Sequence, residues 1–134
     1  MRVAVRATEE AVIRLLKAGH PLPANLINRE EEIRLPVFQS VEAVPVKNYG
    51  IEGTGRIVLA RGRKDVWFVD IKRRPSKVSL DDSKDFITVR DQLQSKFSGQ
   101  KVTGWLVTTS TLDPKAQAFI DSVECFATPG AAKR

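Results

Sequence analysis

The chain has little cysteine or histidine: among its 134 residues, Cys125 is the only cysteine and His20 the only histidine. One cysteine cannot form an internal disulfide or a cysteine-rich zinc site, and one histidine excludes zinc sites built from several histidines. A Ser-His-Asp or Cys-His catalytic device would depend on His20 alone. Carboxylates, lysines, arginines and hydroxyl groups remain, and these suit magnesium and phosphate chemistry better than acyl transfer.

Long hydrophobic runs are also missing. The apolar stretch Val66–Val69 is far too short to span a bilayer. Near the start, Glu9 and Glu10 arrive before the apolar region of a secretory signal could develop. We therefore expect a cytoplasmic protein without a membrane partner. The length predicts a single domain over residues 1–128, followed by a disordered tail over 129–134.

Positive charge is in excess, with a net charge of +6. A basic balance favours polyanionic partners, because neutralised phosphates release condensed counterions. Much of the charge falls in one stretch, which contains Arg61, Arg63, Lys64, Lys72, Arg73, Arg74 and Lys77. This stretch is either a solvated turn and strand end or a phosphate-binding surface.

The order of expected elements indicates an α/β fold. Hydrophobic spacing and capping signals predict helices from Thr8 to about Ala18, from the Asp81–Ser83 region to Gly99, and from Asp113 onward. Strands are expected near 33–35 and 41–46, in a hairpin over 56–60 and 66–72, and over 102–108. This order predicts a mixed central β-sheet flanked by helices.

One charged pair stands out at the end of the second hairpin strand. Asp70 and Lys72 are two residues apart, so their side chains project from the same face. The strand before them is apolar on both faces, and a charge on such a strand needs a compensating partner. Asp70 should therefore meet either a protein cation or a bound metal ion.

The segment Asp70-Ile71-Lys72, placed at the end of an apolar hairpin strand, resembles the hallmark of the PD-(D/E)xK nuclease superfamily. The resemblance covers most of the chain, since the family's restriction-endonuclease-like core has the order αβββαβα. The stretch Gly104–Ser110, leading into Ala116 and Ala118, is similar to the matching strand and helix of Mrr-like and junction-resolving members.

The resemblance implies a metal-dependent endonuclease, a hydrolase that cleaves phosphodiesters, of DNA more than RNA. Mg²⁺ or Mn²⁺ would be held by Asp70, the carbonyl of Ile71, Glu52 and Glu9, and Lys72 would orient the attacking water. The nucleic-acid contacts would come from Arg61, Arg63, Lys64, Arg73, Arg74 and Lys77. Family members often act as dimers, so a homodimer is also an expectation.

The chain departs from the family at Arg56, where members carry an aspartate before the first hairpin strand's apolar run. If Ala60 pairs with Val66, Arg56 faces Asp70 and would neutralise it. A second hypothesis is therefore a noncatalytic nucleic-acid-binding or accessory module on the same fold, with Arg56 pairing Asp70 in place of metal. A third is a protein-interaction domain whose basic residues only solvate its surface.

Overall fold

The computed structural model describes residues 2–52, 55–72 and 76–130, with side chains from residue 7 onward. The helices are α1 (Arg2–Ala18), the 3-10 helix η1 (Val46–Tyr49), α2 (Leu80–Lys96) and α3 (Pro114–Ser122). Strands are β1 (Ser40–Pro45), β2 (Arg56–Arg61), β3 (Asp65–Lys72), β4 (Lys101–Thr108) and β5 (Phe126–Thr128). The predicted α/β class and its αβββαβα order are confirmed. None of the described helices is both long and apolar enough to cross a membrane.

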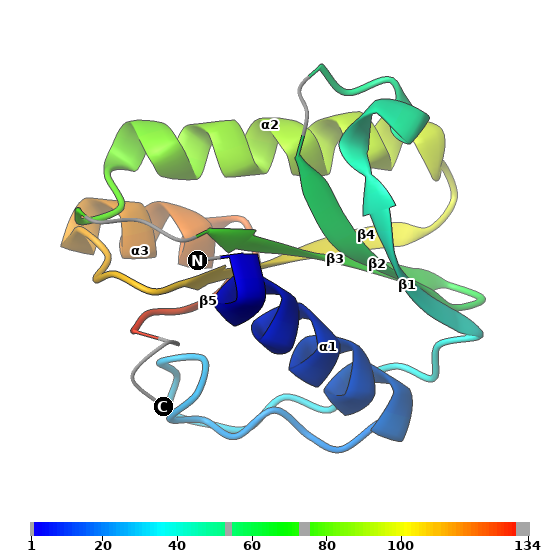
Figure 1. The fold of residues 1–134 in the computed structure, drawn as a ribbon, viewed down its shortest axis with the longest axis horizontal. Helices are drawn as coiled ribbons and strands as arrows, with labels where there is room; N and C mark the ends of the chain where they lie inside the picture. The colour runs from blue at the N-terminus through cyan, green and yellow to red at the C-terminus, as the bar shows by residue number, and fades with distance from the viewer. Residues whose placement is uncertain (1, 53–54, 73–75, 131–134) are drawn as a thin grey trace.

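The five strands form one mixed sheet in the order β1-β2-β3-β4-β5. The first three are antiparallel, and β3, β4 and β5 are parallel. Helix α1 covers one face, whereas α2 and α3 cover the other (Figure 1). A parallel pair needs a crossover between its strands, and α2 supplies it between β3 and β4. The switch from antiparallel to parallel pairing falls on β3.

Each face of the sheet is buried against its own helices. On the α2 and α3 side the buried cluster includes Leu59, Phe68, Phe86, Leu106 and Ile120. On the α1 side it includes Val12, Leu16, Trp67, Val69 and Trp105. Both tryptophans are thus core residues, as their strand positions predict. Because β3 is buried on both faces, its polar carboxyl end is the exception along the strand.

The β2–β3 hairpin has a register one residue away from the predicted one. Arg61, not Ala60, lies opposite Val66. The turn is shorter than expected, because the N–H of Gly62 donates to the carbonyl of Asp65 at 2.8 Å. In an antiparallel pair a shift of one residue changes which side chains share a face. The predicted alignment of Arg56 with Asp70 is therefore wrong.

Helix starts are set by capping more than by hydrophobic spacing. Helix α2 begins after Ser79, whose side chain and that of Asp82 each bond the other's backbone N–H, so the predicted start at Asp81–Ser83 is late. Helix α1 begins at Arg2, so Thr8 lies inside it and is not a cap. The predicted cap at Asp113 is confirmed, since its side chain accepts from the N–H of Lys115.

Three further differences concern short segments. Ile33 forms only an isolated bridge with Leu22 rather than a strand. Strand β5, with three residues, was too short to give a hydrophobic pattern. Residues 129–130, at the start of the predicted tail, form a turn in which the N–H of Gly130 donates to the carbonyl of Ser110 at 2.9 Å. The rest of the predicted tail, 131–134, lies outside the described residues.

Candidate functional site

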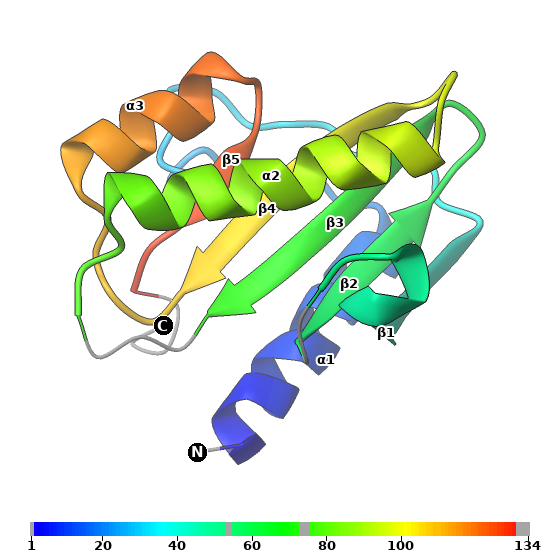
Figure 2. The same cartoon turned by 90° about the horizontal axis from the view of Figure 1, so that it is seen from above.

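Strand β3 runs beside β4 (Figure 2). Asp70 and Lys72 lie together at the carboxyl end of β3. They alternate with Val66 and Phe68, which places both side chains on the α2 side of the sheet. The ammonium Nζ of Lys72 is 3.5 Å from Oδ2 of Asp70, and the two side chains are 27% and 17% exposed. The predicted adjacency of acid and lysine is confirmed, and the acid has a protein cation as a partner.

Arg56 binds a different carboxylate from the one predicted. Its Nη2 donates to Oε1 of Glu9 on α1. Arg56 alternates with Val58 and Ala60, which belong to the α1 side of the sheet. The predicted Arg56–Asp70 pair is therefore replaced by a pair on the opposite face. The cause is the hairpin register described above.

The side chain of Glu9 faces inward from α1. It is 12% exposed, whereas that of Arg56 is 48% exposed. Burying an ionised carboxylate is unfavourable unless an opposite charge or hydrogen-bond donor compensates it. Arg56 supplies both. Glu9 thus has a structural partner of its own on the side of the sheet away from Asp70.

The remaining predicted metal ligands belong to two different segments of the chain. Glu52 is exposed in the segment between η1 and β2. Ile71, whose carbonyl was the fourth predicted ligand, packs its side chain against the α1-side cluster. Within 2–52, 55–72 and 76–130, no three Asp, Glu, His or Cys residues gather where they could hold a metal ion. As the structure describes them, these residues do not fit a Mg²⁺ site.

The predicted nucleic-acid contacts fall at two opposite ends of β3. Arg61, Arg63 and Lys64 surround the β2–β3 turn, whereas Lys77 follows the strand's carboxyl end. With a rise of roughly 3.3 Å per residue, the eight residues of β3 separate these ends by roughly 23 Å. Arg73 and Arg74 lie outside the described residues. The described residues of the basic stretch are thus divided between the two ends of the strand.

Lys77 and Arg61 differ in how they are held. Lys77 is exposed two residues before the cap of α2. Arg61 is also exposed, but its guanidinium lies 4.9 Å from the ring centre of Phe97. Such a cation–π contact limits the side chain's motion and leaves hydrogen-bond donors available. Both residues can still contact an anion.

Two loops meet at the carboxyl end of β3 and β4. The N–H of Val78 donates to the carbonyl of Thr111 at 2.9 Å, and the N–H of Asp113 donates to the carbonyl of Val78 at 2.9 Å. Thr108 Oγ1 accepts from the N–H of Ser110. These bonds fix the loop that leads into α2 against the loop that leads into α3. In an α/β sheet, this end of the parallel strands is where ligands bind.

Cys125 takes no part in this site. It is fully buried among the side chains under α2 and α3. Burial raises the pKa of its thiol, and a hydrogen bond from the backbone of Gly104 offsets only part of that effect. The thiol is therefore protonated and inert at neutral pH.

Comparisons with known proteins add one structural likeness. The chain matches no protein-family model and no curated protein. A solved structure with a similar backbone is that of an EndoMS–dsDNA2 complex, at a TM-score of 0.49 and 21% sequence identity. The similarity covers 68% of this chain and 36% of that one, so this chain spans about a third of the matched protein. An identity this low carries neither site residues nor activity across.

Proposed function

We propose that this chain is a nucleic-acid-binding domain that contacts the phosphate backbone without cleaving it. The observation that carries the proposal is the Arg56–Glu9 ion pair. Through this pair, Arg56 already binds Glu9, the inward-facing glutamate that a metal site beside Asp70 would need as a ligand. At the carboxyl end of β3 the described cations are Lys72, which is paired with Asp70, and the exposed Lys77, on a chain whose net charge is +6.

Lys72 and Lys77 are the described cations that would meet phosphates at this end. Asp70 would act as a positioning residue, because its carboxylate lies 3.5 Å from Lys72 Nζ and restricts where that ammonium can go. The exposed Thr111 adds a hydroxyl group of the kind that often donates to phosphate oxygens. None of these contacts reads a base, so binding should depend little on sequence. We propose DNA as the first partner to test.

The experiment is a fluorescence-anisotropy titration of duplex DNA at several salt concentrations. A Lys72→Ala, Lys77→Ala double variant should weaken binding equally for unrelated sequences and flatten the slope of log K against log salt by about two. Lys17→Ala removes an exposed lysine at the end of α1 and is the matched control. Wild-type protein that binds no DNA at low salt would refute the proposal and favour the protein-interaction hypothesis.

Metal-dependent cleavage, with Mg²⁺ or Mn²⁺ as cofactor, is the second candidate. One observation favours it: Asp70 and Lys72 lie together, partly exposed, where β3 ends. The candidate needs carboxylates beyond Asp70, so Glu9 would have to leave Arg56 or Glu52 would have to contribute. It predicts stoichiometric Mn²⁺ binding that Asp70→Asn abolishes, together with nicking of plasmid DNA. Absence of heat on Mn²⁺ titration would eliminate it.

A further inference from the structure

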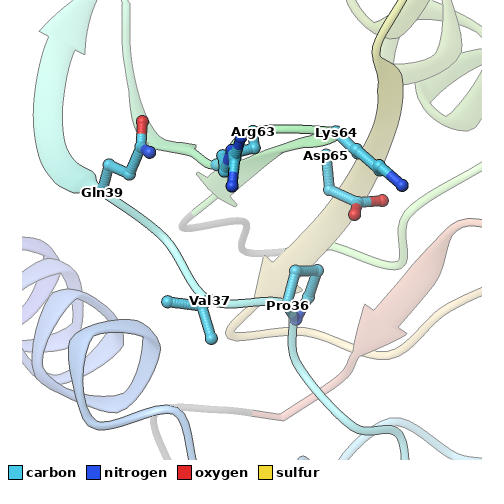
Figure 3. A pocket seen from close by; sticks show the side chains of 7 residues that line it. Pro36, Val37, Gln39, Arg63, Lys64 and Asp65 are labelled. Atoms are coloured by element: carbon cyan, nitrogen blue, oxygen red, sulfur yellow. The ribbon is translucent and has the colours of Figure 1, made fainter.

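A recess lies at the opposite end of the sheet, between the β2–β3 turn and the segment that leads into β1 (Figure 3). Its volume is about 750 Å³. This is within the size range of small-molecule sites, which run from about 300 to 1,000 Å³. Around Gly62, its side-chain lining consists of Pro36, Val37, Gln39, Arg63, Lys64 and Asp65.

The walls of the recess are held in place by hydrogen bonds to their backbone carbonyl groups. The N–H of Gln39 donates to the carbonyl of Arg61 at 2.7 Å. From the other side, Gln100 Nε2 donates to the carbonyl oxygens of Gly62 at 2.9 Å and Arg63 at 3.1 Å. A Cβ on Gly62 would lie 2.8 Å from the carbonyl oxygen of Val37. The close approach of the walls therefore requires glycine, and the turn is held in place before any ligand arrives.

The lining combines three kinds of chemistry in one small space. Val37 is 88% exposed and is the one large hydrophobic side chain left exposed in the described ranges. Gln39 and Asp65 offer an amide and a carboxylate for hydrogen bonds across the recess. Arg63 and Lys64 are exposed cations on its rim. An apolar wall, a few polar groups and two cations match the base, the base edge and the phosphate of a nucleotide.

An acidic peptide fits this lining less well. Its carboxylates would meet the carboxylate of Asp65 as well as the cations, and like charges repel. A nucleobase carries amino and imino N–H groups, from which the carboxylate of Asp65 can accept hydrogen bonds. Cations continue beyond the recess, since Lys96 and Lys101 are exposed near the same end and Arg61 is stacked on Phe97. Lys101 is paired in part with Glu124, at 3.3 Å.

We propose that this recess receives one unpaired nucleotide of single-stranded nucleic acid, with its base against Val37 and its phosphate near Arg63 and Lys64. The inference rests on the proposed function and deepens it, because it adds a second contact that only an unstacked base can make. Apolar and aromatic side chains commonly cover the faces of such bases. The recess is roughly 23 Å along β3 from Lys72, so the two contacts can be tested separately.

The experiment compares a fluorescent oligothymidylate of twelve nucleotides with a strand of the same length that lacks all bases. Wild-type protein should bind the oligothymidylate at least about fivefold more tightly, a ratio that corresponds to about 1 kcal/mol for one covered base. Val37→Ser should remove most of this preference without weakening binding to the abasic strand. Arg63→Ala should weaken binding to both strands by a similar factor.

Two controls separate folding and the proposed function from the inference. Val37 is exposed, so Val37→Ser should keep the wild-type melting temperature. Lys115→Ala removes an exposed lysine at the far end of the sheet and should change neither affinity. Equal affinity of wild-type protein for both strands, or a preference that survives Val37→Ser, would overturn the inference. If duplex binding still depends on Lys72 and Lys77 in that case, the proposed function stands without it.

Discussion

The Arg56–Glu9 pair allows a quantitative prediction about stability. An ion pair on an open surface contributes only about 0.2–1 kcal/mol. Arg56, at 48% exposed, would by itself suggest a value in this range. Glu9 is only 12% exposed, however, so removing the arginine leaves a mostly buried carboxylate without that partner. Leaving a buried polar group unsatisfied costs about 1–3 kcal/mol, and more for a charged group.

We therefore expect Arg56→Ala to lower the free energy of unfolding by about 1–3 kcal/mol. Glu9→Gln should cost less than about 1 kcal/mol, because the amide oxygen can still accept from the guanidinium and no charge is buried. The asymmetry is the diagnostic feature. In the Glu9→Gln background, Arg56→Ala should cost less than half of what it costs in the wild-type protein.

Urea denaturation followed by circular dichroism measures all four proteins. With an m-value of about 1–3 kcal/mol/M, Arg56→Ala should lower the midpoint by roughly 0.3–3 M. Arg14→Ala removes an exposed arginine from α1, the helix that carries Glu9. It is the control and should shift the midpoint little. Equal costs of Arg56→Ala in both backgrounds would refute the reasoning, because they would show that the two side chains are not coupled.

Three further predictions concern stability. Gly104→Ala should destabilise the protein by about 1–3 kcal/mol, because the added Cβ would lie 2.6–2.8 Å from atoms of two phenylalanine rings. Gly55→Ala, which has open space around the added Cβ, should not destabilise it, and chemical denaturation compares the two variants. Ser79→Ala removes the cap of α2 and should lower the free energy of unfolding by about 1 kcal/mol. Ser98→Ala, at an exposed position, should cause no loss of stability, and thermal melts compare the two variants. Because burial raises the pKa of Cys125 in the folded state, the contribution of this thiol to stability is intact below the pKa of the unfolded thiol and is lost as the pH rises above that pKa. Thermal melts at alkaline pH should show this loss of stability in wild-type protein but not in Cys125→Ala. An equal loss in both proteins would contradict the prediction.

Much of the fold follows from local sequence signals. The two-sided hydrophobicity of Val66–Val69 predicts a central strand, and the cap and proline at Asp113–Pro114 predict a helix start. The adjacency of Asp70 and Lys72 follows from the two-residue period of a strand. The spacing of Glu9 relative to the apolar face of its helix predicts that its side chain turns inward.

What the sequence could not predict depends on registers and distances between segments. The partner of Arg56 was decided by the length of one turn, since a shift of one residue moves a side chain to the other face. Arg63 and Lys77 are close in sequence but lie at opposite ends of β3, because an extended strand carries the chain away from itself. The recess beside Val37 forms between segments that no local pattern connects.

The most direct test of binding without metal is the affinity for duplex DNA measured in EDTA and again in millimolar Mn²⁺, with the DNA recovered and sized afterwards. We predict binding that persists in EDTA and is no tighter in Mn²⁺, together with DNA that stays intact, because lysine and arginine would neutralise the phosphates and Mn²⁺ would only compete with them. Loss of binding in EDTA, or cleavage in Mn²⁺ that Asp70→Asn abolishes, would contradict the proposal and restore the hydrolase.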